Sequence, residues 1–319
     1  MQAVVVQGPD RQPEIIDVPV PEVNAGQVRV RVLAAGLNAI DSAIAAGMLR
    51  GMMDHDDPVV LGRDAAGVVD AVGEGVTGIA VDDVVVGHVL LTPPIKHGTF
   101  AEYAVLSADT VVAVPEGMDP VTAAAIPLAG ATAVATVDAV APTDGEVVLI
   151  AGASGGVGSF AVQLAARRGA RVIATGQPDD VVRLRRLGAG QVVDHREGTV
   201  EQVRASQPDG VDAIIDLVSF TPEDARVLAE LLHDGGRLAS TNSAADSDAL
   251  AARGITATNV MGAPLAHTVA ALVEQVANGA LTVDIGRVVD LAAALDGLQT
   301  FATGHTQGNT VVRTGEVDA

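Results

Sequence analysis

The stretch that decides the fold is VVLIAGASGGVGSFAVQLAARRGARVIATG, which runs from Val147 to Gly176. It starts with a continuous apolar run, which is typical of a parallel strand covered on both faces. Apolar residues after the glycines then recur at the spacing of one helix face as far as Gly169, and a second strand follows. Strand, turn, helix and strand in this order predict the first unit of a doubly wound parallel α/β sheet.

The turn inside this stretch gathers four glycines, Gly152, Gly155, Gly156 and Gly158. A tight turn from strand to helix leaves the first helical N–H groups unpaired, and the helix dipole adds partial positive charge there. A pyrophosphate fits that field, and glycines let the backbone approach it. The register departs from the usual G-x-G-x-x-G because Ala153 stands at the first position. The flanking strand and helix favour dinucleotide binding over a structural turn. The residues expected to bind are Ser154, Gly155, Gly156, Val157 and Gly158.

The end of the second strand indicates which dinucleotide binds. Folds that prefer NAD carry an Asp or Glu there, roughly 20 residues past the glycines, which binds the ribose 2′-hydroxyl. Gly176 occupies this place, between Thr175 and Gln177, and we expect these three residues to line the ribose. The missing carboxylate leaves room for a 2′-phosphate, so NADPH is the expected cofactor.

Charged residues just beyond this strand bear on the same choice. Asp179 and Asp180 are close enough to repel a phosphate if they turn inward. Arg183 would compensate by binding the cofactor. An exposed helix charge is an equally good interpretation of this arginine.

Composition excludes several classes of protein. The chain of 319 residues is 49% hydrophobic but only 2% aromatic, which predicts about two domains with aliphatic cores. The net charge of −21, with no basic cluster to offset it, argues against a nucleic-acid partner. The lack of cysteine excludes disulfides, thiolate nucleophiles and zinc sites that use sulfur. The first residues lack the charged start and apolar core of a signal peptide, so we expect a cytoplasmic protein without a membrane partner.

The sequence pattern changes twice along the chain. Residues 1–120 read as short strands, such as QVRVRVLAAG (27–36), in which apolar and polar residues alternate at first. Residues 121–263 alternate strands with helices. Residues 264–319 hold a helix and a final strand, NTVVR, and are too short to form a domain alone. We therefore expect a discontinuous β domain of residues 1–120 and 264–319, with a dinucleotide-binding domain of residues 121–263 inserted.

One helix of the inserted part has clear end signals. In TPEDARVLAELLHDGG, Thr221 is the expected N-cap and Pro222 the first helical residue. Gly235 is expected near the end of this helix.

Six segments spread over nearly the whole chain have a distinctive order: GLNAIDSAIAAG (36–47), PVVLGRDAAGVVDAVGEGV (58–76), GTFAEYAVL (98–106), AAAIPLAGATA (123–133), AGASGGVGSFAVQLA (151–165) and GHTQGNTVV (304–312). This order resembles the medium-chain dehydrogenase/reductase superfamily, in its zinc-free quinone oxidoreductase branch of the zeta-crystallin type. The resemblance implies a GroES-like β domain, a Rossmann domain, a cleft between them that holds the active site, and a homodimer paired through Rossmann edge strands.

Two positions in these motifs bear on metal binding. Zinc-dependent members of the superfamily carry a cysteine in a GxCxxD segment and a histidine in GHE, whereas this chain has Asn38 and Arg63 there. The resemblance therefore implies that no metal is bound and argues against an alcohol dehydrogenase reaction, which needs a metal-stabilised alkoxide. What remains is hydride delivery to an acceptor that is already electrophilic, such as a quinone or an α,β-unsaturated carbonyl.

The same motifs suggest site residues, each with an alternative. The Asn38 amide would bond an acceptor oxygen or the nicotinamide ribose, or the residue is a plain turn residue. Thr132 resembles the family threonine whose hydroxyl lies near the nicotinamide, or its hydroxyl bonds within its own helix. His195 falls where relatives have a tyrosine against the adenosine, or it is a surface histidine. Asp41 is expected to support a helix start, and Tyr103 to pack. The remaining histidines are expected to be solvated or satisfied in the core; they include His88, His97 and His267.

The sequence as a whole predicts a metal-free, NADPH-dependent reductase of quinones or enones, with Asn38 and Thr132 as the catalytic candidates and water as the proton source. An enoyl-thioester reductase is the main enzymatic alternative, although the acidic chain offers little basic surface for its acyl carrier. A non-catalytic NADPH-binding structural or interaction protein is the alternative of another class.

Overall fold

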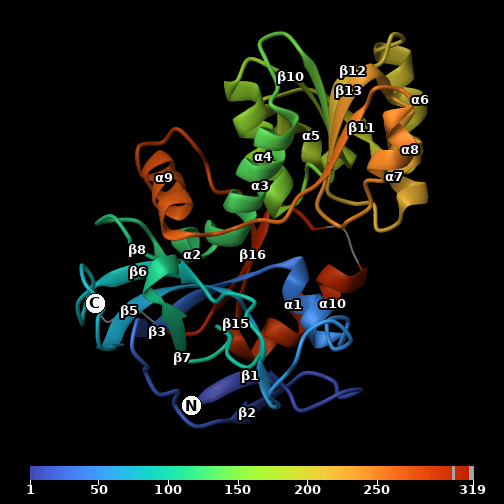
Figure 1. Ribbon diagram of the computed structural model, residues 1–319. Coiled ribbons are helices and arrows are strands. Elements are labelled where there is room, and N and C mark those ends of the chain that lie inside the picture. Colours follow the sequence, from blue (N-terminus) through green and yellow to red (C-terminus); the bar gives the residue numbers. More distant parts are fainter. Residues whose placement is uncertain (304–305, 316–319) are drawn as a thin grey trace. The chain divides into compact units, whose positions relative to one another are not determined.

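The computed structural model describes residues 1–303 and 306–315, and the chain divides into two compact units (Figure 1). Unit 1 is made of Met1–Ala129 and Pro264–Ala319, and unit 2 of Gly130–Ala263. Unit 2 is a doubly wound α/β fold and unit 1 is built on β-sheet, which confirms the predicted fold class. In the described ranges, every helix falls short of the length and apolarity needed to span a bilayer.

Unit 2 contains a parallel sheet in the order β11-β10-β9-β12-β13-β14. Its strands are β9 (Val147–Ala151), β10 (Arg171–Gly176), β11 (Ala189–Asp194), β12 (Val211–Asp216), β13 (Leu232–Ser240) and β14 (Thr256–Asn259). The chain winds outward from β9 in one direction and from β12 in the other. Ligands bind at the carboxyl ends of the strands at such a reversal.

Right-handed crossovers that run in opposite directions put helices on both faces of this sheet. Figure 1 shows α4 on one side of the strands and α7 and α8 on the other. The helices are α4 (Gly156–Arg167), α5 (Val181–Arg186), α6 (Thr199–Ser206), α7 (Pro222–Ala229) and α8 (Ser247–Ala251), and α3 (Pro127–Val140) continues into unit 2 from unit 1. All residues of β9 are buried because both faces are covered. The core around β9 is aliphatic, as the composition predicts; it includes Leu149, Ile173, Ile214 and Leu238.

The start of α7 is confirmed and its predicted end is wrong. The Thr221 side chain accepts a hydrogen bond from the N–H of Asp224, as an N-cap does. The helix ends at Ala229, well before Gly235. The N–H of Val211 donates to the carbonyl of Leu231 at 2.8 Å, and β13 pairs with β12 from there on. Pairing with a buried neighbouring strand therefore overrides the helical preference of the leucines.

Unit 1 is built from two sheets. The larger has the order β15-β16-β3-β5-β6-β8, with β7 also paired to β3, and the smaller has the order β2-β1-β4. The strands are β1 (Gln2–Val6), β2 (Glu14–Asp17), β3 (Gln27–Leu37), β4 (Val59–Val60), β5 (Asp64–Val72), β6 (Val84–His88), β7 (Tyr103–Ser107), β8 (Val111–Ala113), β15 (Ile285–Asp290) and β16 (Asn309–Arg313). The helices are α1 (Ala39–Ala45), α2 (Pro120–Ala124), α9 (Ala266–Ala277) and α10 (Ala294–Thr303).

The C-terminal part of the chain joins the N-terminal sheet through β16, which pairs antiparallel with β3. This strand is the NTVVR segment, and its prediction is confirmed. The motif GHTQGNTVV begins at residues 304 and 305, which lie outside the described residues.

Candidate functional site

The glycine-rich turn joins β9 to α4 by close backbone packing. Gly152 has a φ of +84°, a conformation that favours glycine. A Cβ atom on Gly158 would lie 2.2 Å from the carbonyl oxygen of Gly152 and 2.5 Å from the Cα of Ala153. The N–H of Gly152 donates to the hydroxyl of Thr175 at 2.8 Å, which ties the turn to the end of β10. Gly158 therefore allows α4 to start directly on the turn.

The first turn of α4 is open to a ligand. Gly155 is its N-cap and offers no side chain to the N–H groups that follow. Gly155, Gly156 and Val157 are half-buried rather than enclosed. Helix N–H groups that have no cap, together with the helix dipole, form a site for an anion. The predicted pyrophosphate contacts Ser154 to Gly158 are thus brought together at one helix start.

The end of β10 is closely packed around Gly176. A Cβ atom on Gly176 would lie 2.8 Å from Leu184 Cδ1 and 3.1 Å from Asp180 Cβ. Asp180 is fully buried, and its Oδ2 accepts the N–H of Gln177 at 2.8 Å. Asp180 therefore packs against the end of β10, where Thr175, Gly176 and Gln177 lie.

Arg183 connects this strand end to the glycine-rich turn. Its Nη2 donates to Asp180 Oδ1 at 2.7 Å and to the carbonyl of Ser154 at 3.1 Å. Its side chain is 24% exposed, so the arginine is not a free helix charge. Asp180 turns inward, as the sequence allowed, while Asp179 is exposed. The ion pair with Arg183 therefore neutralises the charge of the buried Asp180 carboxylate next to the glycine-rich turn.

His195 lies at the carboxyl end of β11, the strand that pairs with β10. It follows Asp194, the last residue of β11, which is paired in register with Gly176. The His195 side chain is exposed in the short helical turn after β11. The structure therefore places it beside the strand end that the ribose is predicted to contact.

The loop after β12 belongs to this site and was not predicted from the sequence. Asp216, paired in register with Ala151, is fully buried, and its Oδ1 accepts the N–H groups of Val218 and Ser219 at 3.1 and 3.0 Å. Val218 lies against the glycine-rich turn, since a Cβ atom on Gly152 would be 2.8 Å from Val218 Cγ1. Within the described residues, Asp216 Oδ2 is enclosed without a hydrogen-bond partner. The sequence signal that could have indicated this loop is an aspartate, Asp216, at the end of an apolar strand.

Thr132 lies on α3 in unit 2. In the part of the chain that the structure describes, its hydroxyl makes no hydrogen bond within its own helix, whereas Thr136 donates to the carbonyl of Ala133 at 3.0 Å. A Cβ atom on Gly262 would lie 2.1 Å from Thr132 Oγ1. Thr132 as a whole is 8% exposed, and its hydroxyl borders this glycine.

Asn38 and its neighbours form a polar cluster in unit 1. Asn38 caps α1, and its N–H donates to Asp41 Oδ2 at 2.8 Å, so Asp41 supports the helix start as expected. The Asn38 side chain donates from Nδ2 to Asp64 Oδ2 at 2.9 Å. Asp64 Oδ1 lies 2.6 Å from Nδ1 of His88, a histidine that is therefore satisfied in the core, as predicted.

The position that carries a zinc-ligating histidine in other members of the predicted family is filled by Arg63. This arginine is 1% exposed, and its Nη2 donates to the carbonyl of Val60 at 3.4 Å. Burial lowers the pKa of Arg63, against the opposing charges of Asp41 and Asp64. Among the described residues, no three histidine or acidic side chains gather to hold a metal ion. Arg63 has no lone pair to offer a metal, so this donor set does not fit zinc.

Tyr103 lies on β7, where the Arg29 guanidinium carbon is 5.7 Å from the centre of its ring. This cation–π contact in a paired strand agrees with the packing role that was predicted.

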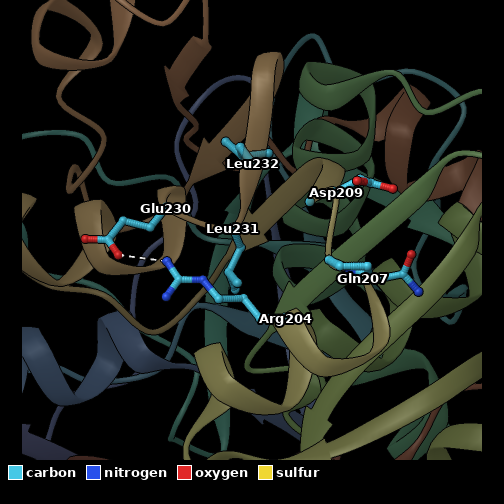
Figure 2. A pocket seen from close by; sticks show the side chains of 8 residues that line it. Arg204, Gln207, Asp209, Glu230, Leu231 and Leu232 are labelled. Atoms are coloured by element: carbon cyan, nitrogen blue, oxygen red, sulfur yellow. Dashed lines mark hydrogen bonds and ion pairs between the residues drawn. The ribbon is translucent and has the colours of Figure 1, made fainter.

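A separate hollow of about 330 Å³ lies in unit 2, where α6 and α7 end. Figure 2 shows Arg204 directed toward Glu230, with Gln207 and Asp209 on the other side of Leu231. The ion pair between Arg204 and Glu230, at 3.0 Å, satisfies both charges. The residues that line this hollow include neither a histidine nor a hydroxyl group. None of the predicted site residues lines this hollow.

Two family descriptions match the chain. Residues 24–116 match the alcohol dehydrogenase GroES-like domain, and residues 156–277 match the zinc-binding dehydrogenase family.

Curated relatives include synthases and reductases. A polyketide synthase of Streptomyces halstedii is 40% identical over 213 residues, which are 66% of this chain and 4% of the synthase. A 2-methylene-furan-3-one reductase of Solanum lycopersicum is 32% identical over 67% of this chain and 55% of its own length. The quinone oxidoreductase of Sus scrofa is 34% identical over 72% of this chain and 69% of its own length. The chain thus spans only a small part of the synthase and about half of the tomato reductase.

Solved structures match over nearly the full chain. The quinone oxidoreductase of Coxiella burnetii has a TM-score of 0.88 at 27% identity and covers 99% of both chains. A protein described as an NAD-dependent alcohol dehydrogenase has a TM-score of 0.86 at 30% identity, covering 99% of this chain and 100% of its own. A mycobacterial protein complexed with NADPH has a TM-score of 0.85 at 28% identity, covering 98% of this chain and 100% of its own.

Proposed function

Because this chain belongs to the medium-chain dehydrogenase/reductase superfamily, in its quinone oxidoreductase-like branch, we propose that it is an oxidoreductase that transfers hydride from NADPH to a quinone or an α,β-unsaturated carbonyl without a metal. The observation that carries this proposal is the turn from β9 to α4. Gly158 brings the helix start onto the turn, and Gly155 leaves its N–H groups uncapped. This arrangement suits a pyrophosphate.

The residues fit NADPH as a cofactor, which when bound supplies the hydride through its nicotinamide. The N–H groups at the start of α4 bind the pyrophosphate. Arg183, which is paired with Asp180 and bonded to the carbonyl of Ser154, is the cation assigned to the adenine ribose and its 2′-phosphate. His195 borders the same edge and covers the adenosine end.

The choice of NADPH over NADH rests on position 176. Glycine stands where a carboxylate would bind a ribose 2′-hydroxyl, and Leu184 and Asp180 pack closely against it. Relatives support both cofactors, since one solved structure is a complex with NADPH and another is described as NAD-dependent. The absence of a carboxylate at position 176, together with the nearby Arg183, favours the 2′-phosphate.

Asn38 and Arg63 support a reaction without zinc, because they replace the ligands of zinc-dependent members and cannot form their donor set. Without a Lewis acid, the acceptor must already be electrophilic. The names of a quinone oxidoreductase and of a 2-methylene-furan-3-one reductase among the relatives agree with such acceptors. We assign Asn38 and Thr132 to the nicotinamide half of the cofactor, and the proton of the product to water.

Calorimetric titration of the purified chain with NADPH and with NADH tests the first half of this proposal. We expect both to bind, NADPH more tightly. Loss of NADPH absorbance with a panel of quinones and enones tests the second half. A chain that takes up neither nucleotide would contradict the whole proposal, and a chain that binds NADPH but reduces neither the panel nor an enoyl thioester would indicate a non-catalytic NADPH-binding protein.

An enoyl thioester is the second candidate acceptor. The match to a polyketide synthase at 40% identity favours it, because polyketides are built as thioesters. A short N-acetylcysteamine enoyl thioester in the same absorbance assay distinguishes the two acceptors, since it offers the alkene without needing a basic surface for an acyl carrier.

A further inference from the structure

His233 lies at an irregularity in the pairing of two strands of unit 2. β12 and β13 pair at Val211 with Leu232 and again at Ala213 with Arg237. β13 therefore takes five residue steps where β12 takes two, and the residues of β13 between Leu232 and Arg237 form a bulge. His233 is the first residue of this bulge.

The ring of His233 lies between two hydrogen-bond acceptors. Nδ1 is 2.8 Å from the carbonyl oxygen of Asp234, and Nε2 is 2.9 Å from Oδ1 of Asp212. A backbone carbonyl and a carboxylate can only accept, so both ring nitrogens must carry hydrogen for both bonds to form. The bond to Asp212 and the bond to Asp234 raise the pKa of His233 above its ordinary value of 6.5, although partial burial and the charge of Arg237 oppose this. The geometry therefore favours the charged imidazolium over a neutral tautomer.

Asp212 is ionised and connects the bulge to a third strand. Its Oδ2 accepts the N–H of Val147, the first residue of β9, at 2.7 Å. Partial burial raises the pKa of Asp212, but the N–H of Val147 and the ring of His233 lower it more, so its pKa lies below the ordinary value. One carboxylate on β12 thus contacts the start of β9 with one oxygen and the bulge of β13 with the other.

The other charged groups near the bulge are paired with one another. Arg237 forms an ion pair with Glu146 at 2.7 Å. The side chain of Asp234 accepts a hydrogen bond from Nε of Arg253 at 3.0 Å. Histidine is the side chain whose ordinary pKa lies nearest to neutral pH, and that of His233 is 41% exposed to the solvent with which it exchanges its proton. His233 is therefore the group in this cluster whose charge changes near neutral pH.

We propose that His233 and Asp212 form a pH-sensitive clamp, which holds the bulge of β13 to the starts of β9 and β12 while the imidazole is charged and loosens when the imidazole is neutral. A neutral ring keeps one hydrogen, so one of its two nitrogens then faces an acceptor without a donor. The clamp lies where the strands begin, whereas the nucleotide is proposed to bind at their carboxyl ends. The inference therefore goes beyond the proposed function and does not depend on it.

NMR signals of the histidine rings, followed from pH 5 to pH 9, test the charge of His233 in the unaltered chain. We expect its midpoint above 6.5, and we expect the amide signal of Val147 to change with the same midpoint because Asp212 contacts both residues. In Asp212→Asn, the amide oxygen accepts the Val147 N–H and the NH₂ group faces Nε2, which favours the neutral ring and lowers the midpoint. The variant His233→Gln identifies the ring signal by its loss.

Urea unfolding over the same pH range gives a second readout. Because the folded-state pKa is raised, the stability that His233 contributes is fully present below the unfolded value of 6.5 and is lost as the pH rises through the folded-state pKa. We expect the urea midpoint of the unaltered chain to fall relative to that of His233→Gln over this window, since glutamine donates to Asp212 without titrating. The titration of other groups is common to both chains and cancels in the comparison. His267→Gln, which removes an exposed histidine of α9, is the matched control.

Each outcome supports or overturns the clamp. A His233 midpoint above 6.5 that Val147 follows and that Asp212→Asn lowers supports it, as does a urea difference that shrinks with rising pH. A midpoint at or below 6.5, a Val147 signal that does not follow it, or a constant urea difference overturns it. The unaltered chain alone gives the first two results, so the test does not depend on a variant that folds. These measurements use no nucleotide, so their failure leaves the proposed function standing.

Discussion

Asp41 and Arg63 are ionisable residues buried near the start of α1. Asp41 Oδ2 accepts the N–H of Asn38, and its Oδ1 has no hydrogen-bond partner within the described residues. Burial raises the pKa of Asp41 to about 7, although the Asn38 N–H and the charge of Arg63 oppose this. The native state therefore keeps a proton on this carboxyl that the unfolded chain releases.

The substitution Asp41→Asn tests this directly. Between the unfolded pKa of 3.8 and the folded pKa of about 7, the native state of the unaltered chain binds more protons than the unfolded state, so its stability falls as the pH rises. Asparagine keeps an acceptor for the Asn38 N–H but does not titrate. We expect Asp41→Asn to gain stability relative to the unaltered chain by up to about 1.4 kcal/mol per pH unit in this window. Urea unfolding from pH 4 to pH 8 measures it, with the exposed Asp179→Asn as the matched control, and a constant difference would contradict the assignment.

Arg183 permits a residue-level test of cofactor choice. Because it pairs with the buried Asp180, the test uses Arg183→Gln in an Asp180→Asn chain, so that no buried carboxylate is left unpaired. We expect NADPH to bind roughly tenfold to a hundredfold more weakly and NADH to be little affected, since only the 2′-phosphate loses a charged partner. Arg185→Gln, an exposed arginine on the same helix, is the control. Equal losses for both nucleotides would show that Arg183 supports the fold only.

The sequence indicates the charges near the ribose site but not their pairing. Two adjacent aspartates precede α5, and only the three-dimensional packing shows that Asp180 turns inward and Asp179 stays exposed. Asp64 is harder to find, because its partners His88 and Leu128 are 24 and 64 residues away. No local pattern predicts contacts of that separation.

At the scale of elements, the contact of α4 with its own turn is the feature that local patterns predict best. Glycine spacing and helical periodicity come from adjacent residues, and the predicted strand, turn and helix are confirmed. The end of α7 is predicted wrongly because the carbonyl of Leu231 accepts a hydrogen bond from β12. Local periodicity carries no information about this distant strand. Local signals thus predict helix starts well, and they fail where a neighbouring strand pairs with the residues expected at the end of a helix.

Gly158→Ala tests the element-scale contact. A Cβ atom there would lie 2.2 Å from the carbonyl oxygen of Gly152, which is backbone and cannot turn away. We expect α4 to shift, with a loss of about 1–3 kcal/mol of stability and the loss of measurable NADPH binding. Gly190→Ala is the matched control, because its Cβ atom would lie 3.7 Å from its nearest neighbour, the carbonyl oxygen of Val172. Thermal unfolding and NADPH titration of both variants report the result, and normal binding by Gly158→Ala would refute the packing argument.

At the scale of the molecule, the family match covers residues of both units, and the predicted fold class is confirmed by it. The expected homodimer through Rossmann edge strands stays a prediction. In unit 2, β14 is at the edge of the sheet, and its pairing within the described residues is to β13 alone. The N–H of Val260 donates to the carbonyl of Ser240 at 2.8 Å. The N–H groups of successive residues in a strand point alternately toward the two neighbouring strand positions. Since the N–H of Val260 points toward β13, the N–H of Ala257, three residues earlier, points away from it.

We therefore expect the purified chain to have about twice its 32.1 kDa mass in light scattering after size exclusion, and Ala257→Pro to shift it toward the monomer. Proline removes an outward N–H that a second copy of β14 would need, and it leaves the ladder to β13 in place. Ala257→Val, which keeps that N–H and suits a strand, should remain a dimer. A monomeric unaltered chain at micromolar concentration would contradict the dimer itself. A dimer that survives Ala257→Pro would show instead that the two copies meet on another surface.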